Sequence, residues 1–330
     1  MTGEVDNQRA GTGSFPTQIE ATRLRFLEYL EVDRNVSQLT IRNYGHYLRI
    51  FATWYDERRG KTDITKFDLE DLRIYRLFLA RKTDPNTGEE LTKKTQSYYL
   101  IALRSMLKWL IKNEQPVMAP DKIELPKVEV HQVKFANLEN IERLLAVPDL
   151  STDKGLRDRA LMEMLFSTGL RVSELVNLNQ EQVDLDRGEF GVVGKGRRPR
   201  VVFMSERATE FVARWLEVRR DKWSPLFINL SRNHPAEVSP DGEEMRLTTR
   251  AVQQLVDAYA RRAHLPLKLS PHGIRHSFAT DLVANGANLR DVQEMLGHKN
   301  IVTTQIYTHV TQPQLRRVHH RFHSEGEKTS

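Results

Sequence analysis

Three short stretches of the sequence carry cationic side chains whose spacing could hold a phosphate group. Arg171 follows a glycine-leucine pair whose glycine is suited to end a helix in the left-handed conformation, so its guanidinium would lie on a fixed corner. Lys195 stands between two glycines at a predicted hairpin tip, where the backbone can approach a partner closely. His272 and Arg275 lie one turn apart on one face of a predicted helix and could clamp a phosphate from two sides.

Each stretch has a simpler interpretation when it is taken alone. Arg171 and Glu174 have the (i, i+3) spacing of a surface ion pair, and basic hairpin tips are common in solvated loops. His272 and His276 have the (i, i+4) spacing of a zinc-binding helix. That pattern needs a glutamate directly after the first histidine, but residue 273 is glycine and the sequence has no cysteine as a further ligand. A metal site is therefore disfavoured, and His276 is predicted to pack or to form a hydrogen bond.

A fourth stretch, residues 296–309, completes the set of candidate residues. The set is then Arg171, Lys195, His272, Arg275, His298 and Tyr307. In order and spacing, these positions resemble the catalytic residues of the tyrosine recombinase, or phage integrase, family, and of its Xer-like branch in particular. The surrounding sequence motifs also match those of the family: T-G-L-R-x-S-E-L, H-x-x-R-H-S-F-A-T, L-G-H and Y-T-H. The resemblance covers nearly the whole chain.

The resemblance implies a role for each of these residues. Tyr307 would attack the DNA backbone and form a 3′-phosphotyrosine link, which conserves the bond energy and needs no cofactor, neither ATP nor metal. A phenol with a pKa of about 10 attacks poorly unless its proton is taken up and the phosphate charge is neutralised. The two arginines would hold the non-bridging oxygens, and the two histidines would add hydrogen bonds or transfer protons. Lys195 would protonate the leaving 5′-oxygen, and Glu174 would support the site.

The activity implied by the resemblance is site-specific recombination, in which DNA strands are cut and rejoined through a Holliday junction. The implied partners are double-stranded DNA at specific recombination sites and further copies of the chain in a homo-tetramer, with or without a second recombinase or an accessory protein. The biological role would be Xer-like chromosome dimer resolution, or integration and excision of a mobile element. Two alternatives remain open: DNA relaxation by a type IB topoisomerase, which shares this chemistry, and a DNA-binding accessory factor that has lost cleavage.

Composition permits a nucleic-acid partner without demanding one. Lys and Arg number 50 against 44 Asp and Glu, a formal net charge of +6, so basic residues must be sorted onto one face by the fold. No apolar run reaches the roughly 18 residues of a membrane helix. The first residues lack the basic stretch followed by an apolar one that is typical of a secretory signal, so none is expected. The absence of cysteine excludes disulfides and favours an intracellular protein. With the resemblance, we expect a cytoplasmic, nucleoid-associated protein with no membrane partner.

Hydrophobic periodicity predicts a mainly α fold in two domains. Residues 1–16 are small and polar and are predicted to form a flexible tail. Residues 17–115 contain four predicted helices (17–32, 37–59, 68–81 and 92–113), which the resemblance identifies as a SAM-like, DNA-gripping core-binding domain. Residues 116–130 contain three prolines without a helical period, so a linker is predicted there.

Residues 131–311 are predicted to form an α+β catalytic domain. Its strand-like runs are 183–185, 190–193 and 201–204, separated by hairpin turn signals, and they predict a small antiparallel sheet. Its predicted helices are 136–147, 156–167, 209–222, 249–263, 271–285 and 289–296. In the tail 312–330, Leu315, Val318 and Phe322 form an apolar stripe that would dock on a neighbouring protomer or on the chain's own domain.

Basic residues outside the catalytic set are candidates for contacts with the DNA backbone, although each could be a solvated charge. They lie on the predicted helices of the first domain and around the predicted hairpin of the second, and a recombinase that grips DNA should make several such contacts. These candidates are Arg42, Arg49, Lys93, Lys94, Arg104, Arg197, Arg198 and Arg200.

Overall fold

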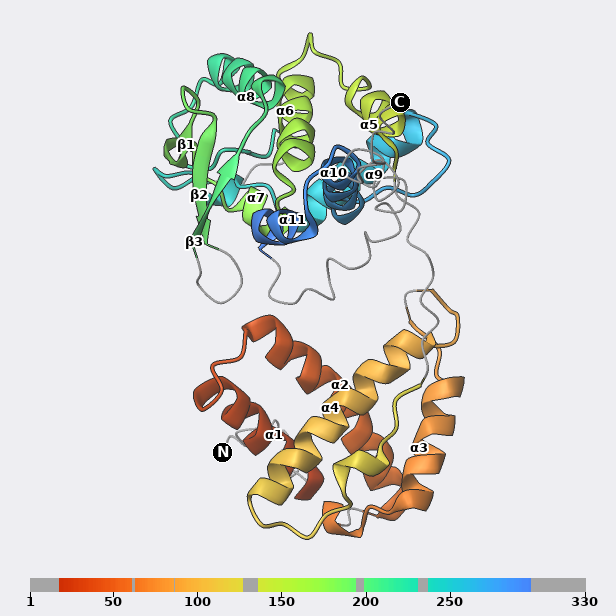
Figure 1. Cartoon of the computed structure of the whole chain (residues 1–330). Helices are drawn as coiled ribbons and strands as arrows, with labels where there is room; N and C mark the ends of the chain where they lie inside the picture. Colours follow the sequence, from red (N-terminus) through yellow and green to blue (C-terminus); the bar gives the residue numbers. More distant parts are fainter. Residues whose placement is uncertain are drawn as a thin grey trace, which may run out of the picture. The chain divides into compact units, whose positions relative to one another are not determined.

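The computed structural model describes residues 18–60, 63–85, 87–126, 136–193, 199–230 and 237–297. The chain divides into two compact units, residues 1–131 and residues 132–330. Each unit has its own hydrophobic core, as the sequence predicts for two domains. Among the described residues, no helix is both long and apolar enough to cross a membrane. Figure 1 labels the helices and strands of both units.

The first unit contains four α-helices that match the four predicted ones to within a residue or two. They are α1 (Gln18–Val32), α2 (Gln38–Arg59), α3 (Leu69–Arg81) and α4 (Lys93–Lys112), with the short 3₁₀ helices η1 (Ile64–Lys66) and η2 (Pro120–Lys122). Side-chain caps fix three of the starts, because Ser37, Asp68 and Thr92 each accept a hydrogen bond from a backbone N–H three residues on. The helices enclose an aromatic core that includes Phe51 and Tyr75.

The predicted linker needs a correction in its described part, residues 116–126. Residues 116–126 pack on the first unit instead of leaving it. Ile123 is fully buried in the core of that unit, and Val117 and Met118 pack against the same core. Arg76 of α3 also donates a hydrogen bond to the carbonyl of Glu124. Proline density excludes an α-helix here and leaves only the short 3₁₀ helix η2, but the apolar residues between the prolines still hold the segment against α4.

The helices of the second unit surround α6 (Asp153–Thr168). Figure 1 shows α8 (Glu206–Val218) and the sheet on one side of α6, and α5 (Leu138–Leu145), α9 (Thr249–Arg262) and α10 (Pro271–Ala284) on the other. Most residues of α6 are buried, including charged ones such as Glu163. The remaining helices are α7 (Val172–Val176) and α11 (Leu289–Leu296), with η3 (Gln180–Gln182) and η4 (Glu243–Met245). All six predicted helices are present, whereas α7 was not predicted.

The sheet of the second unit is the predicted antiparallel one. Its strands β1 (Val183–Asp184), β2 (Glu189–Val193) and β3 (Pro199–Phe203) are hydrogen-bonded in the order β1-β2-β3. In the β2–β3 pair, Phe190 lies opposite Val202 and Val193 lies opposite Pro199. Alternate residues are buried, so one face packs on the core while Val201 and Phe203 of the other face remain exposed. The predicted fold class, mainly α with a small antiparallel sheet, is confirmed.

Candidate active site

Gly169 ends helix α6 and sets the position of Arg171. Its φ of 59° is left-handed, and its N–H bonds the carbonyl of Leu165, so the predicted helix end is confirmed. A β-carbon at this position would lie 2.3 Å from Cδ1 of the Phe278 ring, so any residue other than glycine would force that ring to move. Two residues later Arg171 caps the short helix α7. The guanidinium therefore starts from a tightly packed corner.

Glu174, on α7, is the acceptor around which the site's cations gather. Arg171 donates to it twice, from its backbone N–H (2.9 Å to Oε2) and from Nη1 (2.8 Å to Oε1). The carboxylate is only 8% exposed, whereas the Arg171 side chain is 33% exposed. The pair is thus not the surface ion pair of the simpler interpretation, because its acidic member is buried.

Arg275 lies on α10, which begins with Ser270 as its N-cap and Pro271 in its first turn, as predicted. The arginine is 3% exposed and holds two separate segments through backbone carbonyls. Its Nη1 donates to Gly169 O and its Nη2 to Leu296 O, both at 2.6 Å. Nη1 also lies 3.9 Å from Oε2 of Glu174. Arg275 therefore connects the end of α6 with the end of α11, beside Glu174.

Arg171 also contacts the C-terminal end of α11. Its Nη2 donates to the carbonyl of Gly297 at 3.1 Å, one residue beyond the carbonyl that Arg275 holds. Two guanidinium groups that are far apart in the sequence are thus brought together at one helix end. Carbonyls at a helix C-terminus carry partial negative charge, so they orient the guanidinium groups without neutralising them.

His272 and His276 form a hydrogen-bonded pair along α10. Their Nε2 atoms are 2.8 Å apart, so one ring donates and the other accepts. His276 is 6% exposed, in agreement with its prediction as a packing or hydrogen-bonding residue, whereas His272 is exposed. Within the described ranges, no group of three or more His, Asp or Glu could hold a metal ion.

Arg200 requires a correction. It was predicted as a DNA contact, but its side chain, 13% exposed, is directed at Glu174. Nη1 donates to Oε1 at 3.1 Å and Nη2 to Oε2 at 2.9 Å, a two-pronged pairing that occupies both carboxylate oxygens. Its Nε donates to the carbonyl of Met295 at 3.2 Å. Sequence reasoning missed this pairing because the two partners are 26 residues apart and on different elements.

The electrostatics of Glu174 follow from these contacts. Burial by itself raises the pKa of this carboxyl group, but hydrogen bonds from Arg200 and from the Arg171 backbone, together with attraction to both guanidinium groups, outweigh burial and lower the pKa to about 2. Glu174 is therefore ionised at neutral pH. Among the described residues, the carboxylate of Glu174 faces three guanidinium groups, those of Arg171, Arg200 and Arg275, so positive charge exceeds negative charge in this part of the site. Such a site favours an anion.

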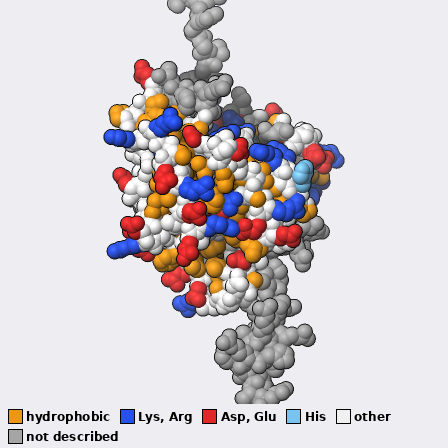
Figure 2. Space-filling model, turned by 90° about the horizontal axis from the view of Figure 1, so that it is seen from above, with side chains coloured by type: hydrophobic (Ala, Val, Ile, Leu, Met, Phe, Trp, Pro, Cys, Tyr) orange, Lys and Arg blue, Asp and Glu red, His pale blue; other side chains and the backbone are white. Residues whose placement is uncertain are grey.

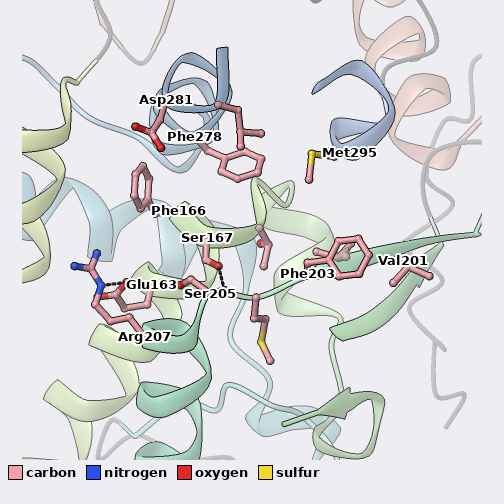
Figure 3. A pocket seen from close by; sticks show the side chains of 14 residues that line it. Glu163, Phe166, Ser167, Val201, Phe203, Ser205, Arg207, Phe278, Asp281 and Met295 are labelled. Carbon is pink, nitrogen blue, oxygen red and sulfur yellow. Dashed lines mark hydrogen bonds and ion pairs between the residues drawn. The ribbon is translucent and has the colours of Figure 1, made fainter. Parts of the chain in front are cut away.

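A cavity of about 550 Å³ lies beside this site, between β3, α6, α10 and α11. Figure 3 shows Phe278 and Met295 on the helical side of the cavity and Val201 and Phe203 on the strand. At its base, Glu163 is paired with Arg207 at 2.9 Å. The cavity walls near the exposed strand face are apolar, so the cationic site borders an apolar space.

Several predicted site residues lie outside the described residues. The segment 194–198, which joins β2 to β3, contains three of them, and the remainder follow the end of α11. They are Lys195, Arg197, Arg198, His298, Tyr307, Leu315, Val318 and Phe322. The structure thus brings together Arg171, Glu174 and Arg275, with His272 one turn before Arg275 on α10, and it leaves the roles predicted for the others as predictions.

The candidate DNA contacts of the first unit differ in their surroundings. Arg42 and Arg49 are exposed on α2, and Lys93 and Lys94 are exposed at the start of α4. Arg104, in contrast, is only partly exposed and forms an ion pair with Asp121 at 3.1 Å. Figure 2 views the chain from the upper side of Figure 1, where helices of the second unit are drawn, and on that face the coloured basic and acidic side chains are intermixed. The exposed residues on α2 and α4 remain predictions for phosphate contacts.

Comparison with known families covers both units. Residues 134–313 match the phage integrase family, and residues 24–114 match the N-terminal SAM-like domain of phage integrases. The chain is 36% identical over 304 residues to tyrosine recombinase XerD of Listeria monocytogenes serotype 4b, covering 90% of this chain and 97% of the relative. The chain belongs to the phage integrase family of tyrosine recombinases. Tyrosine recombinase XerC of Pelotomaculum thermopropionicum is 34% identical, with 92% of this chain and 97% of the relative covered.

Solved structures of tyrosine recombinases share the fold. The integrase of transposon Tn1549, in complex with transposon right end DNA, matches with a TM-score of 0.68 at 19% identity, covering 92% of this chain and 99% of that one. The XerH site-specific recombinase, bound to a palindromic difH substrate, matches with a TM-score of 0.64 at 23% identity, covering 92% of this chain and 85% of that one.

The family predicted from the sequence is therefore confirmed, and so is the enzyme class. The protein is a tyrosine-type site-specific recombinase of the Xer-like kind. The two alternatives, a type IB topoisomerase and a catalytically silent accessory factor, are not favoured by these relatives.

Proposed function

We propose that this recombinase cleaves double-stranded DNA at specific sites through Tyr307, with Arg171, Lys195, His272, Arg275 and His298 as its other catalytic residues. The observation that carries the proposal is the convergence of Arg171 and Arg275 on the C-terminal end of α11, beside the single carboxylate of Glu174. This convergence supports a site for one phosphate group. No metal and no nucleotide cofactor takes part in the proposed reaction.

In this proposal, Arg171 and Arg275 provide most of the electrostatic stabilisation of the transition state. A scissile phosphate would accept hydrogen bonds from both guanidinium groups, and those bonds strengthen as negative charge builds up in the pentavalent transition state. Their present carbonyl partners hold them in place beforehand, so little reorganisation is needed when DNA binds. Removal of one such donor should slow cleavage by a factor of about 100 to 1,000.

The remaining proposed catalytic residues act in proton transfer and hydrogen bonding. We infer that Lys195 protonates the leaving 5′-oxygen and that His272 and His298 assist in hydrogen bonding or proton transfer at the phosphate. The contact between the Nε2 atoms of His272 and His276 supports a fixed ring orientation for His272. Glu174 would act through Arg171 without touching DNA.

The biological setting is part of the same proposal. Two relatives named XerD and XerC support an Xer-like role, chromosome dimer resolution, with integration and excision of a mobile element as the second reading. The complexes of XerH with difH DNA and of the Tn1549 integrase with transposon DNA support a DNA site as partner. We infer a homo-tetramer on DNA in the cytoplasm, associated with the nucleoid and open to a second recombinase or accessory protein, with Leu315, Val318 and Phe322 as its docking residues.

Trapping of the covalent intermediate tests the proposal. Wild type and Tyr307→Phe are incubated in EDTA with nicked duplexes prepared from fragmented genomic DNA of the source organism, and protein-linked DNA is then sought after denaturation. We expect an adduct that requires Tyr307 and persists in EDTA, and sequencing of the trapped DNA identifies the site. Equal adduct yields from both proteins would overturn the assignment of the nucleophile, and salt-sensitive binding without any adduct would favour an accessory factor.

A further inference from the structure

Arg200 joins three parts of the second unit that each contribute to the proposed phosphate site. It lies on β3, next to the segment 194–198. From there it reaches both oxygens of Glu174 on α7, and it donates to Met295 O in the last turn of α11. The backbone of Gly297 is so close that a β-carbon there would lie 3.3 Å from Nη1 of Arg200. Packing and hydrogen bonds therefore fix this guanidinium from several directions.

The pairing with Glu174 determines how much charge the two phosphate-binding arginines keep. Each carboxylate oxygen of Glu174 is shared between two donors: Oε1 accepts from Nη1 of Arg171 and Nη1 of Arg200, and Oε2 accepts from the backbone N–H of Arg171 and Nη2 of Arg200. Without Arg200, the buried carboxylate would need another counter-charge, and Nη1 of Arg275 is already only 3.9 Å away. The carboxylate would then turn toward Arg171 and Arg275 and withdraw them from a phosphate.

The contact with α11 acts on the same pair of arginines. Met295, Leu296 and Gly297 supply three successive carbonyls, which accept hydrogen bonds from Arg200, Arg275 and Arg171 in that order. Because the three acceptors share one helix end, displacement of one guanidinium shifts the acceptors of the other two. A shift of about 1 Å in a catalytic group is enough to slow a reaction roughly 100-fold.

We propose that Arg200 is a positioning residue for the phosphate-binding pair Arg171 and Arg275, and that it acts through Glu174 and the last turn of α11 without touching DNA. This inference rests on the proposed function, because it takes Arg171 and Arg275 as the groups that hold the scissile phosphate. It replaces the earlier prediction of Arg200 as a phosphate contact of the hairpin.

The first test compares Arg200→Gln and Arg200→Lys with wild type in single-turnover cleavage of the duplex recovered by trapping. Both variants should bind this duplex with the wild-type salt dependence but cleave it about 100-fold more slowly. Lysine should not restore the rate, since one ammonium group cannot span both carboxylate oxygens. Arg187→Gln is the matched control, because it removes an arginine of the same sheet region whose side chain is 75% exposed, and it should cleave at the wild-type rate.

A substrate with a neutral scissile linkage separates positioning from a general loss of structure. A methylphosphonate at the scissile position carries no negative charge for Arg171 and Arg275 to neutralise. If Arg200 acts by orienting these two arginines, most of the deficit of Arg200→Gln should disappear on this substrate. A variant that is slow because its fold is damaged would lose the same factor on both substrates, and that outcome would overturn the inference.

The route through Glu174 has its own test. In a Glu174→Gln background, the further change Arg200→Gln should cost clearly less than about 100-fold, because one of the two partners through which Arg200 acts is already gone and only the contact with Met295 O remains. Full additivity of the two effects would overturn this route. If Arg200→Gln is unfolded in a thermal melt, the same cycle is run with Arg200→Lys, which keeps the charge and most of the side-chain volume.

Other outcomes distinguish the inference from the function on which it rests. A wild type that forms a Tyr307-dependent adduct, beside an Arg200→Gln variant that cleaves as fast, would overturn the inference and leave the proposed function standing. Weaker DNA binding by Arg200→Gln, with a shallower salt slope and normal cleavage of bound DNA, would make Arg200 a phosphate contact after all. A wild type without any adduct would overturn both.

Discussion

Replacement of Gly169 by alanine should both destabilise the second unit and slow DNA cleavage. Gly169 has a φ of 59°, and its alanine β-carbon would meet three side-chain atoms at the junction of α6, α10 and α11. The distances are 2.3 and 2.7 Å to the ring of Phe278 and 3.0 Å to Cδ2 of Leu296. The same glycine supplies the carbonyl that holds Arg275 and precedes Arg171 by two residues. The substitution at Gly169 should therefore affect both the stability of the second unit and the rate of DNA cleavage.

The expected loss in the free energy of unfolding of Gly169→Ala is the sum of two separate terms. A left-handed backbone costs a residue with a β-carbon about 1 to 2 kcal/mol. Overpacking at a filled junction costs about 1 to 3 kcal/mol. The ring of Phe278 borders the cavity of about 550 Å³ in Figure 3, so it can turn away from the new methyl group, which keeps the second term moderate. We expect Gly169→Ala to lower the free energy of unfolding by about 3 kcal/mol.

Gly188→Ala provides the matched control within the same unit. Its φ of 64° is almost the same, but the nearest atoms to its β-carbon are Met204 O and Thr209 Oγ1, both at an ordinary 3.6 Å. It should therefore show the backbone term alone, about 1 kcal/mol. At about 2 to 4 °C per kcal/mol for a unit of this size, scanning calorimetry should separate the two variants clearly. The transition that the control shifts marks the second unit.

Cleavage kinetics complete this test. A displaced Arg171 corner should slow single-turnover cleavage about 100-fold in Gly169→Ala, while Gly188→Ala should cleave at the wild-type rate. The double variant Gly169→Ala with Phe278→Ala should be less destabilised than the sum of the two single variants, since the ring that blocks the methyl group is gone. Equal melting temperatures for Gly169→Ala and Gly188→Ala would refute the steric reasoning.

Three further predictions concern charged side chains. The folded-state pKa of Glu174 is about 2, below its ordinary 4.5, so its charge stabilises the fold fully above about pH 4.5. In urea unfolding, the difference in midpoint between wild type and Glu174→Gln should therefore shrink as the pH falls toward 2. A difference that stays constant with pH would contradict this. Asp71→Asn should cost the first unit about 3 kcal/mol in urea unfolding, because this fully buried carboxylate pairs with Arg58 and Arg59; a loss below 1 kcal/mol would count against it. Lys94→Gln should flatten the plot of log affinity against log salt by about 0.9, and an unchanged slope would remove Lys94 from the DNA contacts.

The fold could be predicted wherever local rules agree with each other. Helix α10 starts where Ser270 and Pro271 predict a start, and α11 ends at Gly297, which is left-handed as a helix-ending glycine should be. The three strands have alternating burial and short turns, so their antiparallel order also follows from the sequence. In contrast, α7 has only five residues, too few for a helical period to be visible. The capping by Arg171 and Glu174 that starts it depends on side-chain geometry.

The site could be predicted in composition but not in its internal pairing. The sequence motifs identify Arg171, Glu174, His272 and Arg275, and the contact between His276 and His272 agrees with a hydrogen-bonding role for His276. The pairing of Arg200 with Glu174 was not predicted, because a basic residue near a hairpin tip has the same sequence signature whether it faces DNA or a buried carboxylate. The choice depends on how β3 is placed against α7 and α11, which is a property of tertiary packing.

The placement of backbone carbonyls explains how this site can hold buried arginines and still attract an anion. Complete burial of a guanidinium requires partners, and carboxylates would supply them at the expense of the positive charge. Here Arg275 is 3% exposed, yet its hydrogen bonds to Gly169 and Leu296 go to neutral carbonyl groups. The carboxylate of Glu174 lies 3.9 Å from Arg275 and accepts hydrogen bonds from Arg200 on both oxygens and from Arg171. Arg275 is thus held by backbone carbonyls at the ends of two helices, α6 and α11, which leaves its charge available to a phosphate.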